Sequence, residues 1–382
     1  MAIFVTSAKH FIPKHMLKRV FLLLMLACAS ATLASAQGFR FQPTPGDTLH
    51  STVVDGQRVI FQLYAPQAKS VSVSGDLPGR IQFSREENGV WKGSFDKIDE
   101  GVYRYQFNVD GVPVYDPRSE LAGETRALLK VQPTGDEFFA QKDVPHGAIA
   151  QRWYYSRTLK QQRRLHVWTP PGYEKSRKKL PVLYLIHGGG DNDASWPGVG
   201  AAGWILDNLL AEGKMVPMIV VMPNGTITGV PNEVPPFAED MITDIIPFIE
   251  KNYAVKAKKD CRAIAGLSMG GMETMEVAFP HYDMFSWVWV MSASFAPGQD
   301  PKAEAARLNL YENAAKMNKS FKMMIFSQGG PSDIAYQNLQ NTLKEVDAAG
   351  LKYEYKENAQ AGHSWGTWRA DLYDLAPRLF KK

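Results

Sequence analysis

The sequence predicts an α/β fold with a mostly parallel central sheet, preceded by a small all-β sandwich. From about residue 151 onward, apolar strand-like runs alternate with helix-like runs, which is the pattern of a parallel sheet with crossover helices. Residues 39 to about 134 hold only short β-rich runs separated by turn residues, which is typical of a sandwich. The 382 residues are enough for both domains.

The first domain is predicted over residues 37–134. Asp110-Gly111, between two apolar runs, is typical of a two-residue hairpin turn. A polar stretch with proline and glycine, residues 135–150, is expected to be the linker to the second domain. The strands expected in the first domain are 58–63, 70–74, 89–95 and 102–109.

The second domain is predicted over residues 151–382. Runs such as 182–186 are apolar at every position, which indicates strands covered on both faces. The strands expected are 153–158, 164–169, 182–187, 218–222, 262–266, 287–291, 322–326 and 352–357. Helices are expected between them, at 203–212, 238–252, 269–279 and 334–349.

Residues 1–36 are predicted to be a secretory signal peptide, because basic residues precede a short apolar run and Ala34-Ser35-Ala36 resembles a cleavage site. The apolar run is far shorter than the roughly 20 residues that span a bilayer, so no membrane association is expected after the leader is removed. The predicted leader implies that the mature protein is secreted or periplasmic. Lipid attachment at Cys28 is the less favoured alternative, and the start of translation, Met1 or Met16, stays open.

The charge and cysteine content exclude several classes of function. Without the leader the chain has 39 basic and 39 acidic residues, which gives no support for a nucleic-acid partner. Cys261 is then the only cysteine, so no internal disulfide forms. The sequence has neither H-E-x-x-H nor paired cysteines, and no metal or other cofactor is implied.

Ser268 is the candidate nucleophile. It lies in Gly266-Leu267-Ser268-Met269-Gly270, which matches G-x-S-x-G, with an apolar strand directly before it and an apolar helix after it. On such a turn the serine hydroxyl is exposed, and glycines flank it because side chains there would collide with the strand and the helix. The alternative is a glycine-rich turn that happens to contain a serine.

His363 is the candidate general base, which a serine hydroxyl needs before it can attack. Only two histidines follow Ser268. The predicted helix carries His281, 13 residues on, roughly 18 Å away at 1.5 Å per residue. His363 follows the last predicted strand, in a loop that can reach the strand ends.

The acid that orients the histidine is one of four aspartates between these two residues: Asp283, Asp300, Asp333 and Asp347. Asp333 follows the predicted strand 322–326 through the loop 327–332, so it is expected at the carboxyl edge of the sheet. Asp347 lies in a predicted helix and Asp283 directly after one. Asp333 is therefore favoured, to hold the histidine tautomer and stabilise the imidazolium.

The remaining candidates surround the reacting carbonyl. The backbone N–H of Met269 is one oxyanion donor, and Gly189 in His187-Gly188-Gly189-Gly190 is the favoured second, with either neighbour possible. His187 itself is expected to be structural. Trp196 and Trp365 are candidates to stack on a sugar or phenolic ring, with simple packing as the alternative.

Residues 150–382 resemble the esterase D-like α/β-hydrolases, and most closely the family-one carbohydrate esterases, which include feruloyl and acetylxylan esterases. The family's triad falls on Ser268, Asp333 and His363, although the acid loop, residues 329–333, is longer and richer in glycine than the usual form. The motifs that carry the resemblance are His187-Gly-Gly-Gly-Asp191 with Trp196, residues 218–225, residues 262–271, and Gly362-His363-Ser364-Trp365 with Trp368-Arg369.

The N-terminal half resembles the immunoglobulin-like domains, related to glycogen-binding modules, that are often joined to such esterases. Residues 89–118 carry this likeness. Such a domain either binds carbohydrate or shapes the active-site cleft, and fold-level likeness does not choose between the two.

The resemblance implies an exported serine esterase that hydrolyses feruloyl or acetyl esters on plant-wall polysaccharide such as xylan, through an acyl-enzyme. A siderophore trilactone esterase is one alternative, which the predicted export disfavours. A non-catalytic carbohydrate-binding protein is another, and the intact serine, histidine and oxyanion glycines argue against it. An acyltransferase would use the same residues, so the sequence leaves it open.

Overall fold

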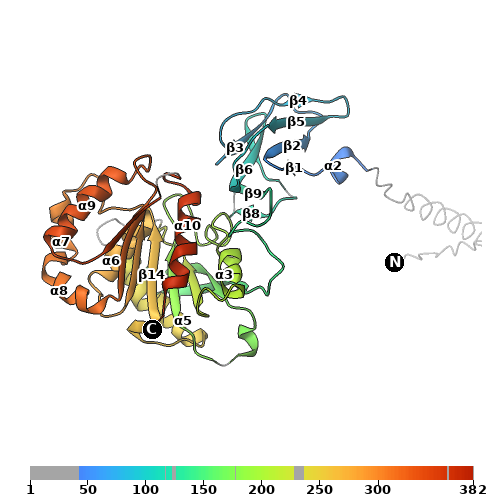
Figure 1. Cartoon of the computed structure of the whole chain (residues 1–382). Coiled ribbons are helices and arrows are strands. Elements are labelled where there is room, and N and C mark those ends of the chain that lie inside the picture. Colours follow the sequence, from blue (N-terminus) through green and yellow to red (C-terminus); the bar gives the residue numbers. More distant parts are fainter. Residues whose placement is uncertain are drawn as a thin grey trace, which may run out of the picture. The chain divides into compact units, whose positions relative to one another are not determined.

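The computed structural model describes residues 43–116, 118–122, 126–176, 178–227, 236–358 and 361–381 (Figure 1). The chain divides into two compact units, Met1–Leu49 and His50–Lys382. Of the first unit only residues 43–49 are described, and they include the short helix α2 (Pro45–Thr48). The predicted leader, with Cys28, Met16 and the cleavage site, lies outside the described residues.

The N-terminal domain is built from two antiparallel sheets, with strand orders β1-β2-β5-β4 and β3-β6-β9-β8, and β7 pairs with β6. Phe61, Tyr105 and Phe107 meet edge to face in its core, and all three are fully buried. The strands are β1 (Thr52–Asp55), β2 (Arg58–Tyr64), β3 (Val71–Gly75), β4 (Ser84–Arg85), β5 (Val90–Phe95), β6 (Gly101–Val109), β7 (Val112–Val114), β8 (Leu121–Ala122) and β9 (Arg126–Val131).

All four strands predicted in this domain are confirmed to within one residue at each end, and so is the hairpin turn at Asp110-Gly111 between β6 and β7. The prediction omitted β1, β4, β8 and β9, of which β9 is the longest. Its run of alanine and leucine residues favours helix by propensity and is buried at four of six positions, so it shows no alternation. Pairing with β6 makes it a strand.

The second domain contains an eight-stranded sheet of order β10-β11-β13-β12-β14-β15-β16-β17. Both pairings of β11 are antiparallel, so β11 alone runs against the other seven strands. The strands are β10 (Ala148–Ser156), β11 (Gln161–Thr169), β12 (Val182–Ile186), β13 (Ile219–Pro223), β14 (Arg262–Leu267), β15 (Trp287–Met291), β16 (Met323–Gln328) and β17 (Glu354–Glu357).

Helices cover both faces of this sheet (Figure 1). Leu183 and Leu185 of β12 pack towards α3 and α10, whereas Val182, Tyr184 and Ile186 pack towards the helices of the other face. The α-helices are α3 (Ala202–Ala211), α4 (Pro236–Asp240), α5 (Ile246–Asn252), α6 (Met269–Ala278), α7 (Pro301–Arg307), α8 (Leu310–Ser320), α9 (Tyr336–Ala348) and α10 (Trp365–Leu375), and the 3-10 turns are Tyr173–Lys175, Lys259–Cys261 and Ala376–Arg378. The predicted α/β class with a mostly parallel sheet is confirmed.

The helix predicted over residues 238–252 is interrupted. A π-helical segment, Met241–Ile245, lies between α4 and α5. Pro247 in the first turn of α5 has no N–H to donate, which removes one α-helical hydrogen bond at this junction. The wider turn leaves the Asp244 carboxylate facing Arg157, which donates to it at 2.8 Å.

The stretch predicted as a linker, residues 135–150, is packed rather than free. Ala140 is fully buried, and Asn208 of α3 donates hydrogen bonds to the carbonyls of Phe138 and Ala140. Strand β10 begins at Ala148, inside the predicted linker. The two domains of the second unit are therefore joined by a segment that belongs to the core of the hydrolase sheet.

Candidate active site

Ser268 lies between β14 and α6 in a strained backbone conformation, with φ at 52° and ψ at −119°. A serine rarely adopts this conformation, and strain of this kind concentrates at functional sites. The flanking positions require glycine: a Cβ on Gly266 would lie 2.1 Å from the carbonyl oxygen of Gly270, and one on Gly270 would lie 2.3 Å from that of His187. The close contacts hold the turn in its strained form and keep the Ser268 hydroxyl at the sheet edge.

His363 joins Ser268 to Asp333. Its Nε2 lies 3.0 Å from Ser268 Oγ, and its Nδ1 lies 2.7 Å from an oxygen of Asp333. The imidazole also packs edge to face against Trp368, with ring centroids 5.1 Å apart. Three residues separated by up to 95 positions in the sequence thus form one line of hydrogen bonds, in the arrangement of a serine, a base and an acid.

The Asp333 carboxyl is buried and stays ionised. The backbone N–H groups of Gly329 and Ala335 donate to it at 3.0 and 2.9 Å. Burial opposes its ionisation, but hydrogen bonds from His363, Ser292 and these two N–H groups outweigh burial and lower its pKa to about 2. A carboxylate with this pKa is charged at any physiological pH.

The glycine-rich acid loop has a structural reason. A Cβ on Gly329 would lie 2.0 Å from the carbonyl oxygen of Gly362, and the Gly362 N–H donates to the Gly329 carbonyl at 3.1 Å. The loop of the acid and the loop of the histidine therefore touch backbone to backbone. Glycine at position 329 leaves the room that this backbone contact needs.

The other aspartates lie elsewhere. Asp300 caps α7 by accepting the N–H of Ala303 at 3.2 Å, Asp347 lies within α9, and Asp283 is exposed in the turn after α6.

The two candidate oxyanion donors lie beside Ser268. Met269 is the first residue of α6, so its N–H has no acceptor within the helix. Gly189 lies in a turn that the Asp191 N–H closes on the Gly188 carbonyl at 3.2 Å. A Cβ on Gly188 would lie 2.6 Å from a methyl carbon of Leu267, so this turn packs directly against the serine turn.

His187 stabilises the turn that carries Gly189 through contacts with backbone groups. It is buried, its Nδ1 lies 2.8 Å from the Gly188 carbonyl oxygen, and the Gly225 N–H donates to its Nε2 at 3.0 Å. Burial lowers its pKa below the usual range, which keeps the ring neutral. These contacts are those of a structural residue, as the sequence led us to expect.

The prediction that Trp196 binds substrate is wrong. Trp196 is 1% exposed, its indole N–H donates to the Ile186 carbonyl at 3.1 Å, and it is not among the residues that line the cleft. Trp365 does line the cleft and packs edge to face against Trp196, with ring centroids 5.1 Å apart. The sequence shows aromatic rings near these loops but not which of them the neighbouring rings cover.

Ser268 and His363 open onto a cleft of about 480 Å³, which is in the range of small-molecule binding sites. Part of its wall comes from strand β6 of the N-terminal domain and the residues just before it, which the sequence analysis did not assign to the site. The lining residues are Asp76, Asp99, Glu100, Val102, Tyr103, Arg104, Gly188, Gly189, Asp191, Leu267, Ser268, Ala361, His363, Ser364, Trp365, Gly366, Trp368 and Arg369.

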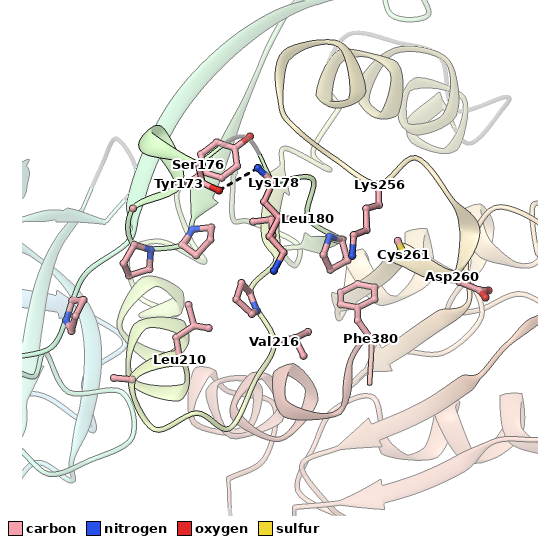
Figure 2. A pocket seen from close by; sticks show the side chains of 17 residues that line it. Tyr173, Ser176, Lys178, Leu180, Leu210, Val216, Lys256, Asp260, Cys261 and Phe380 are labelled. Carbon is pink, nitrogen blue, oxygen red and sulfur yellow. Dashed lines mark hydrogen bonds between the residues drawn. The ribbon is translucent and has the colours of Figure 1, made fainter. Parts of the chain in front are cut away.

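A larger cavity, of about 650 Å³, lies at the amino edge of the sheet (Figure 2). Leu180 precedes β12 and Cys261 precedes β14, and Figure 2 shows both in its wall together with Lys178, Lys256 and Phe380. None of the candidate catalytic residues lines it. The smaller cleft is therefore the candidate active site.

The part of the chain that the structure describes contains no group of three or more histidine, cysteine, aspartate or glutamate side chains placed to hold a metal ion. None of its helices has the length and apolar character needed to cross a membrane.

The chain is similar to known esterases. It is 34% identical over 341 residues to an endo-1,4-beta-xylanase/feruloyl esterase of Xylanibacter ruminicola, a match that covers 84% of this chain and 44% of that protein. A solved ferulic acid esterase is 27% identical, with a TM-score of 0.54 over 62% of this chain and 99% of that one. The enterobactin esterase of Shigella flexneri is 15% identical, with a TM-score of 0.57 over 84% and 92% of the two chains. The chain spans less than half the length of the curated relatives it matches.

Family models match both domains. Residues 46–123 match carbohydrate-binding module 48, the isoamylase N-terminal domain, and residues 156–379 match the family described as "Putative esterase". The resemblance inferred from the sequence motifs is confirmed for both halves of the chain. Because the esterase model spans more than half of the chain, the protein is a member of that esterase family, with an α/β-hydrolase domain behind a domain of the carbohydrate-binding module 48 type.

Proposed function

We propose that this chain is a serine carboxylic ester hydrolase that releases feruloyl groups from xylan. The observation that carries the proposal is the line of hydrogen bonds from Ser268 through His363 to Asp333, which opens onto the cleft. A serine, a base and an ionised acid in this order perform acyl transfer.

In the first half of the reaction, His363 Nε2 accepts the Ser268 proton as Oγ attacks the ester carbonyl carbon. The carbonyl oxygen becomes an oxyanion, for which Met269 and Gly189 supply backbone N–H donors. His363 then gives the proton to the leaving sugar oxygen, and the carbon–oxygen bond to the sugar breaks. The Asp333 carboxylate accepts a hydrogen bond from the Nδ1–H of His363 throughout, and its charge stabilises the imidazolium.

The second half repeats these steps with water. His363 takes a proton from a water molecule that attacks the acyl-enzyme, and the same two N–H groups bind the new oxyanion. When the intermediate collapses, the proton returns to Ser268 Oγ and the free acid leaves. An acyltransferase would use a second sugar hydroxyl in place of this water, so free acid released in water supports the hydrolase.

The cleft supports an aromatic acyl group. Tyr103 and Trp365 line it, and flat rings of this kind stack well on a phenolic ring. The names of the Xylanibacter relative and of the solved ferulic acid esterase point to the same acyl group and, in the first case, to xylan. The sequence left acetyl esters equally open, but an acetyl group is small and has no ring that could stack on an aromatic side chain.

Export belongs to the proposal, because xylan lies outside the cell and residues 1–36 have the composition of a secretory leader. N-terminal sequencing of the protein recovered from the medium or periplasm tests this. We expect Gln37 as the first residue, whereas an intact leader in the cytoplasm would contradict export.

The experiment is a panel of esters offered to the protein and to Ser268→Ala: methyl ferulate, feruloylated arabinoxylan fragments, acetylated xylan and a ferric trilactone. We expect serine-dependent release of ferulate from the first two. Acetate release alone would change the acyl group, and cleavage of the trilactone alone would identify a siderophore esterase. Turnover of none of the four would favour the non-catalytic carbohydrate-binding protein. His363→Asn should behave like Ser268→Ala, with His281→Asn as the matched control because His281 lies outside the cleft.

A further inference from the structure

The side chain of Arg104 joins the N-terminal domain to residues 187–191, the loop that carries Gly189 and is called the oxyanion loop below. Arg104, on strand β6, donates from Nη1 to the carboxylate of Asp191. Its Nε donates to Asp76 at 2.6 Å, and Nη2 donates to the same carboxylate at 3.3 Å. The side chains of Arg104 and Asp191 are only 17% and 6% exposed, so this ion pair is largely shielded from water.

Asp191 is the residue that closes the turn carrying Gly189. Its N–H donates to the Gly188 carbonyl at 3.2 Å, and its own carbonyl accepts from Thr226 Oγ1 at 3.2 Å. Gly190, between them, has φ at 77°, a conformation that glycine adopts without strain. The backbone on both sides of Asp191 is therefore held by the hydrolase domain, and its carboxylate is held by Arg104.

The charges explain why the arginine matters. Arg104 lies between two carboxylates, those of Asp76 and Asp191. Without the guanidinium, Asp191 would be a nearly buried carboxylate with no cation beside it, which is unfavourable. The carboxylate would turn towards water in the cleft, and the turn that it closes would move with it.

Strand β6 is anchored beside Arg104 independently. The buried side chain of Arg369 on α10 donates from Nη1 to the Val199 carbonyl at 2.9 Å and to the Val102 carbonyl at 3.4 Å. Val102 lies two residues before Arg104 on β6. The position of Arg104 relative to the catalytic domain is thus fixed by a second contact.

We propose that Arg104 is a positioning residue for the reaction: through Asp191 it holds the Gly189 N–H where the oxyanion forms. The inference rests on the proposed ester hydrolysis and extends it to the N-terminal domain, which becomes part of the catalytic machinery. A domain that only bound polysaccharide would need no ion pair with the oxyanion loop. If Arg104 positions the oxyanion loop, its loss should slow the reaction of a small substrate that contains no sugar. If the N-terminal domain only binds polysaccharide, the loss of Arg104 should leave that reaction unchanged.

The test compares Arg104→Ala, Arg104→Lys and Asp191→Asn on methyl ferulate, using the full chain. We expect kcat to fall on the order of 10- to 100-fold in Arg104→Ala and Asp191→Asn, because a displaced oxyanion donor acts mainly on the transition state, and KM to stay within about two-fold. Arg104→Lys keeps the charge and should recover part of the rate. The double variant should be no slower than the slower single variant, since both changes break one contact.

Arg126→Ala is the matched control. Arg126 pairs with the same Asp76 at 3.8 Å but is 42% exposed and lies outside the cleft. It should leave kcat unchanged. A loss in Arg126→Ala equal to that in Arg104→Ala would overturn the proposal, because it would point to general damage to the N-terminal domain. Thermal melts of all variants establish that each is folded. If Arg104→Ala does not fold, Asp191→Asn still tests the proposal, because asparagine is nearly isosteric with aspartate.

A second readout separates positioning from binding. An aryl boronic acid forms a tetrahedral adduct with Ser268, so its affinity should fall by the same factor as kcat/KM, while the affinity for ferulate should not change. An unchanged kcat on methyl ferulate, with a raised KM only on feruloylated xylan, would overturn the proposal in favour of carbohydrate binding.

The failure of the proposed function would be recognisable separately. It would show as an absence of ester hydrolysis by the unaltered protein. The rate at which a fluorophosphonate labels Ser268 would then test Arg104 alone. In that reaction the Oγ–phosphorus bond forms, fluoride leaves, and the serine proton passes to His363. If Arg104→Ala is labelled as fast as the unaltered protein, the positioning role is contradicted. Slower labelling of Arg104→Ala would support it.

Discussion

The two edges of the hydrolase sheet differ in what they place around a cavity. At the carboxyl edge, a cleft of about 480 Å³ holds a strained serine, a histidine and a nearby buried carboxylate joined by hydrogen bonds. At the amino edge, a cavity of about 650 Å³ is lined by prolines, aliphatic side chains, two aromatic rings and a few polar residues, among them Ser176, Lys178 and Asp260. The Lys178 N–H donates to Ser176 Oγ at 3.2 Å, but the residues that line this cavity include no histidine. We therefore place the candidate active site by the convergence of hydrogen-bonded groups and not by cavity volume.

The sharpest test of this difference is Ser268→Ala. Loss of the nucleophile should lower kcat on methyl ferulate on the order of a million-fold, as for other serines that act within a triad. Folding should be unaffected, because alanine is smaller than serine and the substitution removes the hydrogen bond between Ser268 Oγ and His363 without adding an atom. Steady-state kinetics and a thermal melt check both parts. Substantial residual turnover would mean that the reaction runs at another site.

Asp333→Asn should have the next largest effect, on the order of ten-thousand-fold in kcat, because an amide offers His363 the wrong hydrogen-bond pattern. The same substitution should change acid stability. The pKa of Asp333 is lowered to about 2, so its charge stabilises the fold above about pH 4, and this contribution is lost as the pH falls towards 2. Chemical denaturation at pH 7 and pH 3 would show a smaller difference in the variant. A near-normal rate would transfer the acid role to another residue.

The sequence predicted the residues whose signals are local. Ser268 lies in a short motif between a strand and a helix, and His363 was the only remaining histidine in a loop at the right edge. The contact of Arg104 with Asp191 could not be predicted from the sequence, because it joins residues 87 positions apart in different domains. Trp196 was misassigned for a related reason: the rings and strands that bury it come from other parts of the chain.

Two buried carboxyl groups at the active-site end of the domain show what hydrogen bonding does to a charge. Asp333 accepts several hydrogen bonds and has a low pKa, whereas Asp371 on α10 accepts one, from Ser327 Oγ at 2.7 Å. Burial raises the pKa of Asp371 to about 7. The folded protein therefore loses stability as the pH rises from about 4 to about 7, because the carboxyl must ionise in a buried place.

Asp371→Asn should remove this loss. We expect the variant to be more stable than the unaltered protein at pH 8, by on the order of 2–4 kcal/mol as an upper bound, and about equal at pH 4. Denaturation curves at the two pH values measure the difference. Asp374→Asn is the control, since Asp374 lies on the same helix, is 40% exposed and pairs with Lys356 at 2.8 Å. Equal behaviour of the two variants would show that burial of Asp371 is not the cause.

Substitutions at the amino edge of the sheet are expected to have the smallest effect on the rate. Cys261→Ser and Lys256→Ala change two side chains in the wall of the larger cavity (Figure 2). Neither residue contacts the Ser268, His363 and Asp333 line, so kcat and KM on methyl ferulate should stay within about two-fold, as for surface substitutions away from the reacting groups. Thermal melts would register any loss of packing at Cys261 separately from the rate. A clear fall in kcat without a fall in stability would mean that the amino edge communicates with the carboxyl edge through the strands between them. The assignment of all catalytic function to the smaller cleft would then be incomplete.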